Sequence, residues 1–202
     1  MRYFISKHRF FFPFLAAFAA LLLASCSDDD SSERLLNRRT KQYFDFRENT
    51  QWVYSASLDA NPLPDHVFTL KNKKQNDGSN NEMGEFISYE LREDRQKWVW
   101  NYRLEVGLTD FANIISVIDK SDASSQQMRA LFWSQSHRFF NERGDSVVFI
   151  DTITVNNQFY DEVWRYRSRN ALHFREILFA PDWGAIRYHL RDGTVLELKE
   201  KR

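Results

Sequence analysis

The chain is poor in cysteine: its 202 residues contain only one. A mature fold must therefore be stabilised by its hydrophobic core, without disulfide bonds. The chain also lacks an excess of basic side chains, since 28 Lys and Arg residues balance 28 Asp and Glu residues. Nucleic acid is therefore not an expected partner. The sequence contains neither a Gly-x-Ser-x-Gly motif nor a glycine-rich phosphate loop, which excludes the enzyme classes that depend on them.

The longest apolar run lies near the N-terminus, at residues 10–24, and is interrupted only by Pro13. At 15 residues it is short for a transmembrane helix, which needs about 20. Arg2, Lys7 and Arg9 precede it without any acidic residue, and small residues follow. A basic head, a short apolar middle and a small-residue end are typical of a secretory signal peptide.

The single cysteine follows this run directly, in Leu23-Ala24-Ser25-Cys26. These four residues resemble the bacterial lipobox, the recognition site of signal peptidase II. The resemblance implies that residues 1–25 are a lipoprotein signal peptide and that Cys26 is the lipidated first residue of the mature chain. Several acyl chains on one residue would give a lasting membrane anchor, whereas one chain binds only marginally.

An acidic stretch, "SDDDSSE" at residues 27–33, follows the cysteine. Its composition predicts a solvated, flexible tether, which we place at residues 26–40. Extended, the tether would reach roughly 45 Å. An acidic run at this place resembles the surface-export signal of Bacteroidota lipoproteins, and Ser27 does not suggest retention in the inner membrane. We therefore expect an outer-membrane location, with exposure at the cell surface favoured over an orientation towards the periplasm.

The rest of the chain, residues 41–202, is expected to form a single β-rich domain. Residues 1–25 hold three of the basic residues and none of the acidic ones, so the chain from Cys26 onward has a net charge of −3. Its length suffices for one domain with a sizeable core. Phe, Trp and Tyr make up 16% of the sequence, and large rings at alternating positions favour strands.

Alternation with a period of two predicts about ten strands and no internal repeat. The hairpin 85–92 and 97–106 is the clearest, because every second residue from Trp98 to Val106 is apolar. Arg191-Asp192-Gly193-Thr194 predicts a second hairpin with an Asp-Gly turn. The expected strands are residues 41–46, 51–57, 66–72, 85–92, 97–106, 147–150, 153–155, 159–168, 172–179, 185–191 and 195–199.

Two segments do not fit this alternation. Residues 113–118 are compatible with a strand or a helix. Ser125 followed by Met128, Leu131 and Phe132 predicts a capped amphipathic helix near residues 124–135. The fold class expected from these patterns is mainly β: an antiparallel meander that forms a curved sheet or a partly open barrel or sandwich, with one short helical insertion.

Three stretches together resemble β-rich outer-membrane lipoproteins of Bacteroidota. "YFDFRENTQWVY" at residues 43–54 is similar to their "YFPLxxGxxWxY" opening, and "ITVNNQFYDEVWRY" at 153–166 to their "NGxxYxxVxxY" strand. "LFAPDWGAIRYHLRDGTVLEL" at 178–198 is similar to their closing "YYAxGVGLVKYE" segment. Asn49 and Asn157 stand where the family pattern has glycine. The resemblance implies a fold and a location, and it carries no catalytic residue.

The sequence nominates no catalytic residue, metal site or cofactor. The histidines downstream of Cys26, namely His66, His137, His173 and His189, include no pair with metal-ligand spacing. The carboxylate pairs Glu93-Asp94 and Asp161-Glu162 neighbour basic residues and are expected to be solvated strand edges. These patterns favour a protein that is not an enzyme.

Two candidate modification sites remain. Asp145-Ser146-Val147 and Asp151-Thr152-Ile153 resemble the Asp-Ser/Thr-apolar acceptor motif for O-glycosylation in Bacteroidota. The alternative for Ser146 and Thr152 is that both are unmodified strand-edge residues, and the sequence leaves the two interpretations open.

The first functional hypothesis is a lipoprotein with a binding or accessory role at the outer membrane. It would be attached to the membrane through its lipid anchor and would bind a protein partner, a glycan or a lipid. The alternative is a carrier that encloses a hydrophobic ligand in its curved sheet, which requires a dry interior cavity. An interior filled by Trp52, Trp98, Trp100 and Trp164 would exclude that alternative. A hydrolase is the third hypothesis and needs a pocket of clustered titratable groups.

Overall fold

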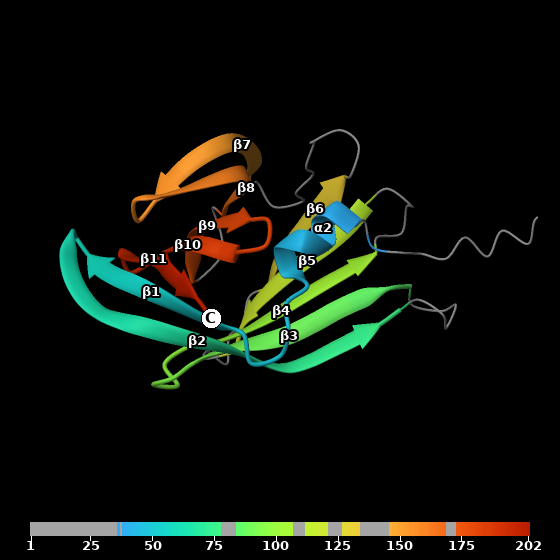
Figure 1. Ribbon diagram of the computed structural model, residues 1–202, viewed down its shortest axis with the longest axis horizontal. Coiled ribbons are helices and arrows are strands. Elements are labelled where there is room, and N and C mark those ends of the chain that lie inside the picture. The colour runs from blue at the N-terminus through green and yellow to red at the C-terminus, as the bar shows by residue number, and fades with distance from the viewer. Residues whose placement is uncertain are drawn as a thin grey trace, which may run out of the picture. The chain divides into compact units, whose positions relative to one another are not determined.

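The alternating segments form eleven strands of one antiparallel sheet, accompanied by one short helix, α2 (Figure 1). The computed structural model describes residues 36, 38–77, 84–106, 112–120, 127–133, 146–168 and 173–202. All of them belong to one compact unit, Glu33–Arg202. The elements are α2 Arg38–Phe44, β1 Gln51–Leu58, β2 Asn61–Asn76, β3 Phe86–Glu93, β4 Val99–Val106, β5 Ala112–Asp119, β6 Gln127–Trp133, β7 Ser146–Val155, β8 Gln158–Arg167, β9 Phe174–Ala180, β10 Gly184–Leu190 and β11 Thr194–Lys201.

The strands follow one another as a meander whose first and last strands pair. The order in the sheet is β6-β5-β4-β3-β2-β1-β11-β10-β9-β8-β7. Every consecutive pair of strands is hydrogen-bonded except β6 and β7, which form the two edges of the sheet, and β1 pairs with β11 instead. The mainly β class and the antiparallel meander are therefore confirmed.

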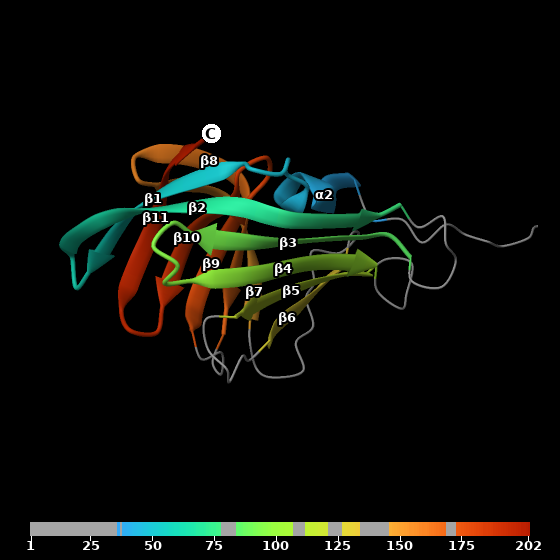
Figure 2. The ribbon, with the colours of Figure 1, turned by 90° about the horizontal axis from the view of Figure 1, so that it is seen from below.

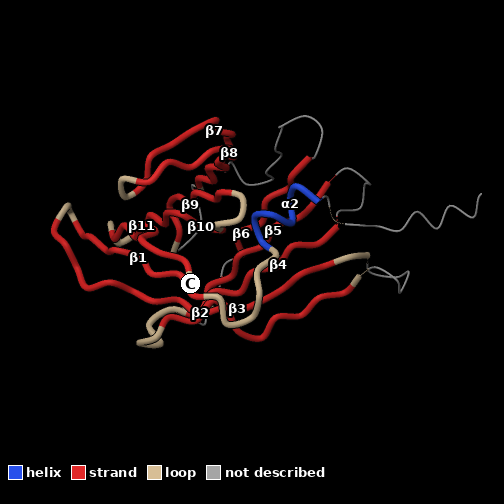
Figure 3. Tube along the Cα trace, in the orientation of Figure 1, coloured by secondary structure: helices blue, strands red, loops and turns tan. Residues whose placement is uncertain are grey.

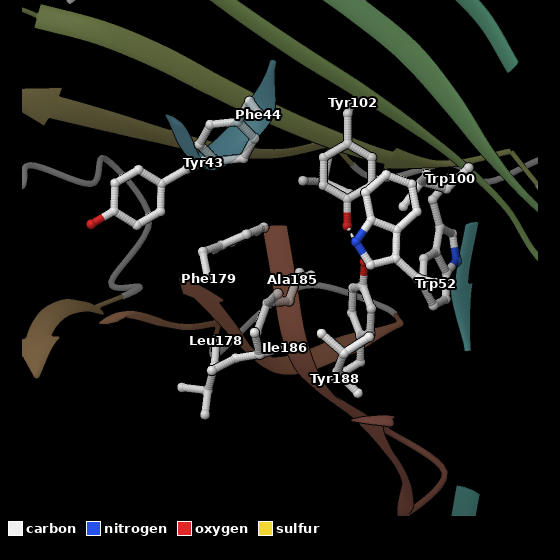
Figure 4. Packing of buried hydrophobic residues seen from close by; sticks show 14 of the residues in the cluster. Tyr43, Phe44, Trp52, Trp100, Tyr102, Leu178, Phe179, Ala185, Ile186 and Tyr188 are labelled. Atoms are coloured by element: carbon white, nitrogen blue, oxygen red, sulfur yellow. Dashed lines mark hydrogen bonds between the residues drawn. The ribbon is translucent and has the colours of Figure 1, made fainter. Parts of the chain in front are cut away.

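The sheet curls so that its two wings face each other (Figures 1 and 2). We call β2–β6 the first wing and β7–β10 the second wing. Trp100 on β4 lies 4.4 Å from Tyr188 on β10, measured between ring centroids. The hydroxyl groups of Tyr102 and Tyr188 are 2.6 Å apart. These contacts close the concave face into a shared core (Figure 4).

Residues 38–44 form a helix, although a strand was predicted for residues 41–46 (Figure 3). The buried residues are Thr40, Tyr43 and Phe44, which have the i, i+3, i+4 spacing of a helix face. In a strand, Tyr43 and Phe44 would point to opposite faces, whereas the helix directs both into the core. Among the described residues, no helix is long and apolar enough to cross a membrane.

The packed domain also begins earlier than the predicted boundary at Lys41. Leu36 is 4% exposed, and its backbone N–H donates a 2.8 Å hydrogen bond to the buried carboxylate of Glu85. Lys41 Nζ lies 2.5 Å from the other oxygen of that carboxylate. The tether expected at residues 26–40 is therefore too long, because its last residues pack on the sheet.

The predicted helical insertion near residues 124–135 is wrong for the part that the structure describes. Residues 127–133 form β6, which pairs with β5 in a register that sets Leu131 opposite Ile114. The spacing of Met128, Leu131 and Phe132 fits a helix locally. The segment forms a strand because its backbone hydrogen-bonds to β5, and such tertiary pairing overrides a weak local preference for helix. Residues 113–118, which were compatible with either structure, lie in β5.

The two segments predicted as strands 147–150 and 153–155 form the single strand β7, joined to β8 by the two-residue turn Asn156-Asn157. Both turn residues have positive φ, 49° and 63°, as a type I′ hairpin turn requires. The turn is also hydrogen-bonded to β11: Asn156 Nδ2 donates to the carbonyl of Leu198 at 3.2 Å. Asn49, in the turn before β1, also has positive φ, 68°.

Asn157→Gly should stabilise the fold. Asparagine tolerates a left-handed backbone better than most residues, but glycine adopts it without a steric cost. We expect a gain of roughly 0.5 kcal/mol in the free energy of unfolding, measured by urea denaturation. Asn157→Ala is the matched control and should lose about 1 kcal/mol. Equal losses for the two variants would contradict the assigned turn.

Candidate functional site

The three stretches that carry the family resemblance meet in one packing cluster. Phe46 contacts Trp52 edge-on, with ring centroids 5.1 Å apart. Trp52 Nε1 donates to the carbonyl of Trp183 at 2.7 Å. Gly184 follows with φ of 79°, and a Cβ there would lie 3.0 Å from Phe46 Cε2. Gly184 is thus required because Phe46, which lies between α2 and β1, packs against its backbone.

The same cluster extends to the second wing through α2. Tyr43 donates a 2.6 Å hydrogen bond from its hydroxyl to the carbonyl of Glu162 on β8. Burial, reinforced by the Glu162 carboxylate, raises the pKa of Tyr43 to about 12. Phe44 packs on Phe179 of β9, 5.2 Å between centroids (Figure 4). These three stretches therefore meet where α2 docks between the wings, and the contacts described here assemble no reactive group.

Lys201, near the C-terminus, covers this cluster. Its ammonium lies 4.2 Å from the centroid of Phe46 and 6.0 Å from that of Trp52, a cation–π arrangement. Nζ also donates to the carbonyl of Asp182. Desolvation by burial lowers the pKa of Lys201. These contacts give the Lys201 ammonium a structural role, because its partners are two aromatic rings and a backbone carbonyl.

Four tyrosines occupy the centre of the core. The hydroxyl of Tyr54 donates to the carbonyl of Ala185 at 2.7 Å, and Tyr89 stacks on Tyr102. Burial raises the pKa of Tyr54, Tyr89, Tyr102 and Tyr188 above the usual value of a phenol. All four therefore stay protonated at neutral pH and act as apolar rings with a polar tip.

Aromatic rings fill the space between the wings at the level of β4 and β10. Trp52, Trp98 and Trp100 are buried, and Trp164 packs against the same core while partly exposed. Trp100 also contacts Phe174 at 5.1 Å. A carrier of a hydrophobic ligand needs this volume empty. The described interior therefore argues against the carrier hypothesis.

The structure brings together one pair of titratable residues that the sequence did not indicate. His66 Nδ1 lies 2.8 Å from Glu93 Oε1, and both side chains are buried. The other oxygen of Glu93 accepts the backbone N–H of Lys97 at 2.9 Å. Trp98 covers the imidazole, with centroids 4.9 Å apart. The expectation that Glu93 is a solvated edge residue is wrong: the β2–β3 register pairs it with Phe68, and its buried carboxylate reaches His66, two residues away on β2.

This pair fixes the β3–β4 turn. Both carboxylate oxygens of Glu93 are engaged, one by the imidazole and one by the turn backbone. Asp94 behaves as expected for an exposed edge residue, and its backbone N–H extends the turn to the carbonyl of Val67. The pair therefore clamps β2 to the hairpin, and no hydroxyl or thiol among its hydrogen-bond partners would make it a nucleophile–base system.

The sequence did not nominate the remaining histidines as a site. His173 and His189 lie at β9 and on β10, and His137 lies outside the described residues. Within the described ranges, no three His, Cys, Asp or Glu side chains gather in a way that could hold a metal ion. Cys26 also lies outside the described residues. Its lipidation therefore stays a prediction from the sequence.

Both candidate glycosylation residues lie on β7. Ser146 begins the strand, Thr152 lies within it, and both side chains are exposed. Asp151, which precedes Thr152 in the acceptor motif, is also exposed. The arrangement leaves both hydroxyls accessible to a transferase, and their modification stays a prediction.

The β7–β8 hairpin carries the most exposed apolar side chain among the described residues, which sequence reasoning missed. Phe159 is 79% exposed, and Val148 is 40% exposed. The register sets Phe159 opposite Thr154, on the face that also bears Thr152. The alternation of the sequence predicts strands here, but it gives no signal that tells this outer face from the inner one.

No family model, no curated protein and no solved structure matches this chain.

Gly184→Ala should destabilise the domain by about 1–3 kcal/mol, because it combines a positive φ with a contact against Phe46. Gly193→Ala is the matched control. Gly193 also has positive φ, but its new Cβ would meet the tip of Leu58 at 3.3 Å and Asp59 Oδ1 at an ordinary 3.8 Å. Urea denaturation should therefore give a larger loss for Gly184→Ala. A loss equal to or smaller than that of the control would contradict the packing of Phe46 on this glycine.

Proposed function

We propose that this chain is a lipid-anchored binding protein of the outer membrane that acts through its outer surface and performs no chemistry. Cys26 carries the lipid, and the β-rich domain binds the partner. The observation that carries the proposal is the occupied interior. Aromatic side chains from both wings fill the concave face, so the surfaces left for binding lie on the outside.

The titratable groups of the interior support a binding role over hydrolysis. A hydrolase needs a general base beside a nucleophile in an accessible pocket. Here the buried histidine–glutamate pair holds a turn, and the buried tyrosines stay protonated at neutral pH. Each of these groups has a role in packing, which leaves the hydrolase hypothesis without a candidate residue among them.

The packing of Leu36 sets the length of the tether. Nine residues, 27–35, separate Cys26 from Leu36, the first buried residue in the described part of the chain. A chain of this length spans at most roughly 35 Å between Cys26 and Leu36. The domain would therefore stay near the membrane surface. Residues 27–33 are acidic and polar, as suits a segment between lipid headgroups and a folded domain.

Cys26→Ser should abolish incorporation of a fatty-acid probe and leave the precursor uncleaved. The hydroxyl of serine does not replace the thiol as the site of lipid transfer. The measurement is metabolic labelling with an alkyne fatty acid in a Gram-negative host, read on a gel beside the mass of the mature chain. Ser27→Ala is the matched control and should label normally. Continued labelling of the Cys26→Ser variant would contradict the anchor.

A further inference from the structure

The outer face of the second wing carries a row of cross-strand partners that includes two arginines. On β8, Arg165 pairs with Val148 of β7 on one side and with Leu178 of β9 on the other. Leu178 in turn pairs with Arg187 of β10. Cross-strand partners lie on the same face of a sheet. The neighbouring row, which includes the buried Tyr188, points into the core, so this row points outward.

The two arginines of this row differ in their partners. Both are partly buried, whereas the other described arginines are exposed. Arg187 donates from Nε to Glu197 of β11 at 2.9 Å, and it forms an ion pair with that carboxylate. Nε of Arg165 is buried, and it has no hydrogen-bond acceptor within the described ranges. Arg165 is thus the partly buried arginine whose charge the described fold leaves unmatched.

Two acidic residues near Arg165 are engaged by other arginines. Glu176 lies opposite Arg167, and its carboxylate accepts a hydrogen bond from Arg167 Nε at 2.5 Å. Glu162, three residues before Arg165 on β8, is bound by Arg39 at 2.7 Å. Partial burial removes water from a guanidinium group, and a charge without a partner then costs free energy. An anion supplied by another molecule would remove that cost.

The charges of this face indicate which kind of anion fits. The arginine and glutamate side chains that the register places in these neighbouring rows are Arg165, Arg167, Arg187, Glu176 and Glu197. Three arginines against two glutamates leave one positive charge. A carboxylate carries one negative charge, and a guanidinium group binds it through two parallel hydrogen bonds. A phosphate dianion would be repelled by the nearby carboxylate of Glu176.

Val148 adds an apolar contact beside the guanidinium group. It lies opposite Arg165 on β7 and is 40% exposed. An acidic residue that binds Arg165 can therefore place a neighbouring apolar side chain on Val148, which removes apolar surface from water. A protein surface presents such a pair of side chains, whereas an acidic sugar chain would bring hydroxyl groups to Val148.

We propose that Arg165 anchors a carboxylate-binding site on the outer face of the second wing, and that an acidic residue of a partner protein, next to an apolar residue, occupies this site. The guanidinium group binds the carboxylate, and Val148 contacts the apolar neighbour. The inference rests on the proposed binding role. It is independent of the anchor, which the labelling of Cys26 tests separately.

The test uses the full-length protein in detergent, labelled with ¹⁵N-arginine, and two blocked dipeptides, acetyl-glutamyl-leucine amide and acetyl-glutaminyl-leucine amide. Nuclear magnetic resonance should show a saturable shift of the Arg165 Nε–H signal on titration with the glutamyl peptide. The glutaminyl peptide, which keeps the shape but lacks the charge, should bind about tenfold more weakly. Arg165→Lys identifies the signal, because this variant lacks it.

Arg165→Gln should weaken binding of the glutamyl peptide about tenfold, because it removes the guanidinium group. Arg175→Gln is the matched control: Arg175 is exposed on β9, and its substitution makes the same change in charge. This control should bind the peptide as the unchanged protein does. The titration of the unchanged protein keeps the test valid if Arg165→Gln unfolds.

Three results would overturn the proposal: no shift with either peptide, equal affinity for both, or tighter binding of inorganic phosphate or a galacturonate disaccharide at the same signal. Binding of the glutamyl peptide that survives unchanged in Arg165→Gln would also overturn this site, while leaving the proposed binding role intact.

Discussion

The fold depends on the contact between β4 and β10 across the concave face of the sheet. An open antiparallel sheet of eleven strands has two faces, and its many aromatic residues need to be removed from water on one of them. Trp100 and Tyr102 meet Tyr188 there, and the paired hydroxyls of the two tyrosines satisfy each other. Once the wings are joined at this level, the curl of the sheet and its filled interior both follow.

Helix α2 depends on that curl, because it can be buried only between two wings that already face each other. Tyr43 reaches the backbone of β8, and Phe44 reaches the core of β9. Glu85, at the start of β3, holds the segment before the helix through Leu36 and Lys41. The first wing is thus held by Leu36, just before the helix, and by Lys41 within it. The second wing is held by Tyr43 and Phe44 at the C-terminal end of the helix.

Much of the sheet could be predicted from the sequence, since β1, β3, β4 and β8–β11 have strong alternation and defined turns. The segments that were predicted wrongly carry sequence signals for both helix and strand. Residues 38–44 contain adjacent aromatic residues that read as a strand until the i, i+3, i+4 spacing of Thr40, Tyr43 and Phe44 is noticed. Residues 127–133 have helical spacing but join β5. In both cases the structure is determined by contacts with residues distant in the sequence. The local sequence pattern of the segment does not indicate those contacts.

The candidate sites also differ in whether a local sequence signal reveals them. The His66–Glu93 clamp joins residues 27 positions apart through the pairing of β2 with β3, which no spacing rule anticipates. The unmatched charge of Arg165 likewise follows from the register of β8 with β9, which sets Glu176 opposite Arg167. By contrast, the lipobox around Cys26 is a local signal and can be read without any fold.

The central claim is that the curled sheet is filled by its own side chains and works through its outer surface. Titration of the purified protein with a fluorescent fatty acid, at concentrations below its critical micelle concentration, tests this most directly. The account predicts no saturable binding and no change in tryptophan fluorescence, because the buried indoles already pack against one another. Stoichiometric binding that quenches those indoles and is displaced by an unlabelled fatty acid would contradict it.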